Sequence, residues 1–78
     1  MKRYKFRYFA LVDGHAIIEE ERMTVKAAKC WLFIEQAIEQ HTRPGDTISA
    51  TVIKLEGPGM GEFDRVYNNV NGKAVRAR

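Results

Sequence analysis

The stretch Arg3-Tyr-Lys-Phe-Arg-Tyr-Phe-Ala-Leu11, followed by Val12-Asp13-Gly14, decides the fold. Aromatic and apolar side chains occupy every second position, and basic side chains lie between them at the start. Such alternation predicts a half-buried β-strand over residues 3–11. Asp13-Gly14 predicts a hairpin turn into a second strand, His15–Met23, because glycine accepts the positive φ of tight turns. The face expected to be buried carries Tyr4, Phe6, Tyr8 and Ala10.

Charge favours one register for this hairpin. A three-residue loop places Arg7 opposite Glu19 and Lys5 opposite Glu21, whereas a two-residue loop places Lys5 opposite the cation Arg22. Opposite charges across an antiparallel pair contribute roughly 0.2–1 kcal/mol, and like charges cost similar amounts. We therefore predict the three-residue loop, with a bulge at its glycine and a ladder of charges along the two strands.

A helix is predicted to follow the hairpin. Thr24 is suited to an N-cap, Val25–His41 has helical periodicity, and Pro44-Gly45 ends the segment. At 100° per residue Phe33 points away from the core stripe, so we expect its ring to be exposed. The expected core stripe carries Ala27, Trp31, Ile34 and Ile38, with Cys30 and His41 at its margin, and the opposite face carries Lys26, Lys29, Phe33, Gln36 and Gln40.

The rest of the chain has the composition of strands and turns. Thr47–Glu56 is rich in β-branched residues and predicts a third strand, and Gly57–Gly61 predicts a flexible surface loop. Phe63–Tyr67 and Lys73–Arg78 predict two short strands around an Asn71-Gly72 turn. The expected fold is a single α+β domain over residues 1–78. One helix packs on a small antiparallel sheet in two layers, in the order ββαβ plus a C-terminal hairpin.

Length and composition limit the classes of protein. A chain of 78 residues with 45% hydrophobic and 29% charged residues predicts one small globular domain. The single cysteine, Cys30, cannot form an internal disulfide, which favours a reducing compartment such as the cytoplasm. No apolar run reaches the roughly 18 residues that a membrane span requires, so we expect no membrane partner.

No constellation of catalytic or metal-binding residues stands out. His15 and His41 suit a turn and a helix C-terminus, and Cys30 lacks a recognisable base. Glu19 and Glu21 are explained by the cross-strand charge ladder, and the glycines of the predicted loop lack the Lys-Ser/Thr of a phosphate-binding loop. We therefore expect a chain without metal, cofactor or enzymatic activity.

Two groups of residues are candidates for binding. Basic residues near both ends could meet nucleic-acid phosphates or an acidic partner if the terminal strands lie side by side. The second group surrounds the expected exposed ring of Phe33 and would bind a host protein or a second copy of the chain. The basic group is centred on Arg3, Lys5, Arg7, Arg76 and Arg78, and the second comprises Phe33, Lys26, Lys29 and Met60.

The order of elements resembles that of some small phage anti-CRISPR proteins that inhibit type I surveillance complexes. The residues that carry this resemblance are Met23-Thr-Val-Lys-Ala-Ala-Lys29, which opens the helix, and the closing hairpin with Asn71-Gly-Lys73. The resemblance implies a compact phage protein that covers a nucleic-acid-binding or partner-binding surface of a larger host complex. No functional residue is transferred by it.

We therefore expect a small non-enzymatic binding protein, an inhibitor of a host nucleoprotein or defence complex such as a CRISPR surveillance complex. The alternative is a nucleic-acid-binding accessory module that uses the basic strand surface. Salt distinguishes them, because binding to phosphates weakens steeply with added salt and an apolar interface is less sensitive.

Overall fold

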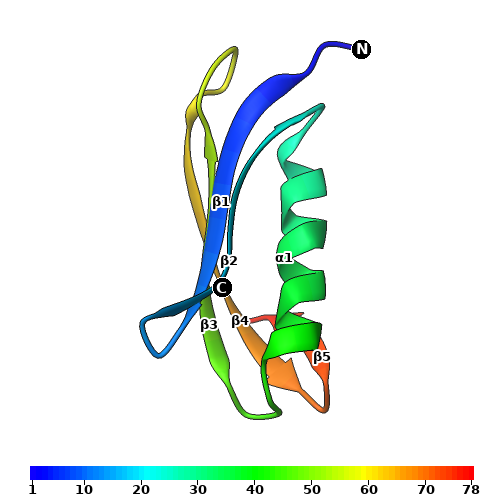
Figure 1. The fold of residues 1–78 in the computed structure, drawn as a ribbon, viewed down its shortest axis with the longest axis vertical. Coiled ribbons are helices and arrows are strands. Elements are labelled where there is room, and N and C mark those ends of the chain that lie inside the picture. The colour runs from blue at the N-terminus through cyan, green and yellow to red at the C-terminus, as the bar shows by residue number, and fades with distance from the viewer.

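A computed structural model describes all 78 residues as one helix and five strands. The strands form one antiparallel sheet in the order β2-β1-β3-β4-β5, and the helix lies across one of its faces (Figure 1). This two-layer arrangement confirms the predicted α+β class and the order ββαβ with a C-terminal hairpin. The elements are β1 (Tyr4–Val12), β2 (His15–Thr24), α1 (Ala27–His41), β3 (Thr47–Lys54), β4 (Gly61–Val70) and β5 (Lys73–Arg76).

The core lies between α1 and the central strands of the sheet. On β1 the buried side chains alternate as predicted, and on the helix they recur at the spacing of one face. Cys30 belongs fully to this core rather than to its margin, whereas His41 is exposed. The core cluster comprises Phe6, Tyr8, Ala10, Cys30, Trp31, Ile34, Ile38, Ile48, Ala50, Val52 and Tyr67.

The β1–β2 hairpin turns in two residues, so the predicted three-residue loop is wrong. Asp13 and Gly14 both have positive φ, 50° and 78°, as in the two-residue turns whose twist matches that of the strands. The bulge lies in β2, where the pairing shifts beyond the Ala10–Ile18 pair and leaves Ile17 without a partner. A bulge of this kind turns two consecutive side chains towards one side of the sheet, and here Ile17 and Ile18 both reach the helix side.

This bulge changes the cross-strand charge pairs. Arg7 lies opposite Glu21 rather than Glu19, and Lys5 lies opposite Met23 rather than Glu21. The predicted register is therefore wrong by two residues. Exposed charge pairs contribute only a few tenths of a kcal/mol to 1 kcal/mol, whereas fully burying one isoleucine contributes about 1.5–3 kcal/mol, and here two isoleucines are each partly buried. Apolar burial at the bulge therefore outweighs the charge ladder.

The helix begins two residues later than predicted and without the predicted cap. Thr24 is the last residue of β2 and pairs with Tyr4, so its backbone belongs to the sheet. The N-cap is Lys26, whose side chain makes no capping hydrogen bond. Strand pairing therefore takes precedence over capping at this junction.

The end of the helix is tied to the β4–β5 turn through a buried asparagine. The Thr42 hydroxyl donates to the Ile38 carbonyl (2.6 Å), and the Asn69 amide donates to the Thr42 hydroxyl (2.8 Å). The backbone N–H of Gly72 donates to Asn69 Oδ1 (2.8 Å). Asn69 is only 3% exposed, and these bonds satisfy its polar atoms as burial requires.

The C-terminal strands differ in length from the predicted ones, because β4 is longer at both ends and β5 ends at Arg76 rather than at Arg78. β4 begins at Gly61 rather than at Phe63 and continues to Val70, and the predicted turn at Asn71-Gly72 is confirmed. Two strands, β3 and β4, separate β1 from β5. At about 4.8 Å per strand, β1 and β5 lie roughly 14 Å apart.

Gly57 has a packing role in the loop between β3 and β4. Its φ is +80°, and a Cβ added there would collide with the ring of Tyr4. The ammonium of Lys54 lies 4.1 Å from the centre of the same ring. The first residue of the predicted loop therefore packs against the start of β1, while residues 57–60 are exposed, as predicted for a surface loop.

We expect the core stripe of α1 to dominate stability. Replacing Ile34, which is fully buried, with alanine should lower the free energy of unfolding by about 2–5 kcal/mol, because the lost side chain leaves a cavity. Replacing the neighbouring Leu32, which is 52% exposed, should have little effect. Urea unfolding followed by circular dichroism measures both, and equal losses would contradict this assignment of the helix faces.

Candidate functional site

The β2 side of the helix is closed by a cluster of four residues. The Tyr8 hydroxyl donates to Glu20 Oε1 (2.9 Å) and accepts from Arg22 Nε (2.7 Å). The Arg22 guanidinium lies 4.2 Å from the centre of the Phe33 ring, which stacks at 6.2 Å on the ring of Tyr8. Burial and the neighbouring Glu20 carboxylate raise the pKa of Tyr8 to about 12.

The β4 side of the helix carries a second cluster with the same composition. The Tyr67 hydroxyl donates to Glu35 Oε2 (2.7 Å) and accepts from Arg65 Nη1 (3.0 Å). The Arg65 guanidinium lies 4.2 Å from the centre of the Trp31 ring, and the Trp31 and Tyr67 ring centres are 6.4 Å apart. Burial and the Glu35 carboxylate raise the pKa of Tyr67.

Phe33 is therefore not the exposed aromatic that the helical wheel predicts. Its ring is half-buried and packs against the core. The prediction is wrong because the sheet is wider than the helix, so a side chain about 200° round from Trp31 still meets β2. The other members of the predicted group, Lys26, Lys29 and Met60, are exposed as expected.

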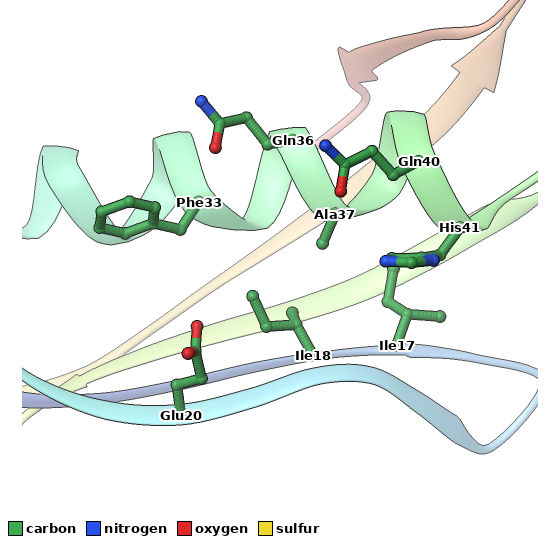
Figure 2. A pocket seen from close by; sticks show the side chains of 8 residues that line it. All are labelled: Ile17, Ile18, Glu20, Phe33, Gln36, Ala37, Gln40 and His41. Atoms are coloured by element: carbon green, nitrogen blue, oxygen red, sulfur yellow. The ribbon is translucent and has the colours of Figure 1, made fainter.

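A groove lies beside this cluster, between β2 and the C-terminal half of α1 (Figure 2). Ile17, Ile18 and Ala37 face one another across it, while the helix residues Gln36 and Gln40 line its outer rim. Its volume is about 310 Å³. Sequence reasoning missed this groove, because the bulge that turns two consecutive isoleucines to the helix side has no glycine to mark it.

The opposite face of the sheet is covered by no other element (Figure 1). Two adjacent rows of side chains cross its centre from β2 to β4. Each row begins and ends with a carboxylate, and the apolar residues Phe9 and Ile53 lie between them, half-buried. The rows are Glu21-Arg7-Ile53-Glu62 and Glu19-Phe9-Thr51-Asp64.

The predicted basic surface is not assembled as expected. Lys5 and Arg7 lie on the uncovered face, where the two rows hold four carboxylates and only one cation, Arg7. Two strands separate β1 from β5, so their basic residues do not meet. Arg76 pairs with Tyr67 in the sheet and lines a groove beside α1, and Arg78 bonds to Val66 at the edge of β4.

Arg3 has a different environment from the other members of that set. It joins Arg22 and Lys29 around a hollow of about 240 Å³ at the start of the helix. The terminal strands therefore do not form one continuous basic surface.

The remaining candidates for chemistry lie apart from one another. Burial raises the pKa of the Cys30 thiol to about 11, which keeps it protonated and weakly nucleophilic at neutral pH. No group of three or more His, Cys, Asp or Glu side chains is arranged to hold a metal ion. The helix is not long and apolar enough to cross a membrane.

Comparisons with protein-family models, with curated proteins and with solved structures find no match to this chain.

The two buried phenols predict a loss of stability at alkaline pH. A tyrosine whose pKa is higher in the folded than in the unfolded chain stabilises the fold below pH 10, and this contribution falls between pH 10 and about 12. Replacing Tyr8 with phenylalanine should flatten the decline in the free energy of unfolding over that range. Urea titrations at pH 8 to 11.5 measure this, and an unchanged slope would contradict the raised pKa.

Phe33 should contribute to stability although part of its ring is exposed. Phe33→Ala removes the contacts with Tyr8 and Arg22 and should lower the free energy of unfolding by about 2 kcal/mol. The exposed Gln36→Ala, one turn along the helix, serves as the control. A melting temperature for Phe33→Ala within error of the wild type would show that the ring belongs to the surface.

Proposed function

We propose that this chain is a non-enzymatic binding protein that docks its uncovered sheet face onto a basic surface of a larger partner. The observation that carries this proposal is the pair of rows across that face, each with a carboxylate at both ends. Phe9 and Ile53 lie between the carboxylates. This arrangement combines an apolar centre with a charged rim, as protein interfaces commonly do.

The charges favour a particular kind of partner surface. The four carboxylates form two columns, one on β2 and one on β4, about 14 Å apart across the sheet. Lysine and arginine side chains of a partner could pair with both columns while its apolar atoms cover Phe9 and Ile53. Proteins that hold nucleic acid present basic surfaces of this kind to the phosphates.

A chain docked on such a surface would compete with nucleic acid. This is the mode of inhibition implied by the resemblance to small anti-CRISPR proteins, and a type I surveillance complex in the host cytoplasm is the partner that it suggests. The acidic rows give that proposal a physical basis in this chain, because they would occupy sites that otherwise bind phosphates.

Direct binding of nucleic acid is the second candidate. The carboxylates of the uncovered face would repel phosphates, so this function would fall to the hollow lined by Arg3, Arg22 and Lys29. Those side chains lie on the helix side of the sheet, which makes the two functions separable by mutation.

The proposal is tested by competition for target DNA. Purified type I surveillance complexes loaded with guide RNA would be incubated with labelled target duplex and increasing amounts of the chain. We expect the chain to displace the DNA from a susceptible complex. Changing both Glu19 and Glu21 to lysine should raise the half-inhibitory concentration by about tenfold or more, because attractive charges become repulsive.

The matched control reverses two charges on the helix instead. Lys26→Glu with Lys29→Glu should leave inhibition nearly unchanged. Loss of inhibition in the helix variant alone would move the interface to the helix side. Inhibition of none of the complexes would refute a surveillance complex as the partner, and salt-sensitive binding of the duplex by the chain alone would support the second candidate.

A further inference from the structure

We infer a second binding site, on the helix side of the sheet, where the free edge of β4 takes up an extended segment of another protein as an added strand. This site lies at the edge of β4 and on the helix side of the sheet, and it shares only the Glu62 and Asp64 side chains with the uncovered face. Peptide binding at the edge and docking of the uncovered face are therefore tested separately. It is formed by the first half of β4 and the N-terminal half of α1.

The first half of β4 has only one neighbouring strand. β5 pairs with residues 67–70 of β4, and the backbone of Ala77 and Arg78 bonds to Val66. Before Val66, β4 pairs with β3 alone. Because backbone groups alternate along a strand, the N–H and C=O groups of Glu62 and Asp64 point to the same side as those of Val66, away from β3. These groups can bond to an added strand.

A groove of about 430 Å³ runs beside this free edge. Phe63, whose side chain is 48% exposed, and Trp31, which is only 6% exposed, both line it together with Ala27 at the start of the helix. In an added strand the side chain opposite Phe63 would point into this groove. An apolar residue there would cover the exposed part of the phenyl ring.

The charged side chains around the groove favour particular residue types at the next positions of the added strand. Arg65 and Arg76 line the same groove, and Arg76 donates only to the carbonyl of Arg78 (3.4 Å) and pairs with no carboxylate. A residue opposite Arg65 would also face the groove, which favours Asp or Glu. The added strand has one residue between those opposite Phe63 and Arg65. Its side chain faces the other side of the sheet, beside Glu62 and Asp64, so Lys or Arg is favoured there.

The expected occupant is therefore an extended segment with an apolar, a basic and an acidic residue in succession. A second copy of the chain does not fit this pattern. Pairing two β4 edges symmetrically about Phe63 would place Glu62 of each copy opposite Asp64 of the other, and like charges directly opposite are destabilising. The segment belongs to a different protein.

Short peptides test this site directly. The probes, which end opposite Arg65 because Ala77 and Arg78 occupy the edge at Val66, are Thr-Thr-Thr-Ile-Lys-Glu for a parallel added strand and Glu-Lys-Ile-Thr-Thr-Thr for an antiparallel one. Titration into the 15N-labelled chain, followed by amide chemical shifts, should move the signals of Glu62 and Asp64 most for one of the two. The same peptide with its Lys and Glu exchanged should bind at least about fivefold more weakly, because two favourable pairs become repulsive.

Two variants separate strand addition from other contacts. Asp64→Pro removes a free N–H without breaking a backbone bond to β3, so it should abolish binding, whereas Asp64→Ala keeps the N–H and should still bind. Both variants lose the side-chain bond from the Thr51 hydroxyl to Asp64, so the comparison isolates the N–H. Phe63→Ala should weaken binding if Asp64→Pro fails to fold. Shifts centred on other strands, equal binding of the exchanged peptide, unchanged binding by both Asp64→Pro and Phe63→Ala, or no binding of either probe would overturn the inference.

Discussion

A single helix has to cover one face of a five-stranded sheet, and this mismatch in width shapes the rest of the molecule. A helix is about 10 Å wide, whereas five strands at about 4.8 Å spacing span about 19 Å. Each flank of α1 is therefore closed by the same set of side chains: a buried tyrosine, a glutamate, an arginine and an aromatic ring of the helix. The aliphatic stem of each arginine extends the apolar layer. Its guanidinium stacks on the aromatic ring, donates to the tyrosine hydroxyl and lies within 4 Å of the glutamate carboxylate.

The elements could be predicted because each rests on a local pattern. Alternation in β1, helical periodicity in α1 and the glycine turns all act over a few residues, and the structure confirms their place and order. The hairpin register could not be predicted in the same way. It depends on the bulge at Ile17, which is favoured by contacts between β2 and a helix that begins ten residues later in the chain. Charge pairs at the surface contribute too little free energy to determine the register, so they do not predict it.

The candidate surfaces were harder to predict than the elements, because they depend on strand order. The basic surface predicted from the sequence requires the first and last strands, which carry Arg7 and Arg76, to lie side by side. In the sheet, β3 and β4 lie between them. The acidic rows draw on β1, β2, β3 and β4 at once, and no spacing within the chain brings Glu21 and Glu62 to one row. Phe33 shows the same limit, since a helical wheel gives directions around the helix but not the width of the sheet beneath it.

The distribution of charge favours a partner unlike the chain itself. Stacking two copies through their uncovered faces would bring the carboxylate columns on β2 and β4 against one another, with few cations between them. Such an approach would desolvate carboxylates without pairing them, which costs more than covering Phe9 and Ile53 would contribute. The free edge of β4 carries the same sign of charge on that face. A basic partner meets neither obstacle, because each carboxylate that it covers can be paired. The same residues that oppose self-association therefore favour association with a basic surface.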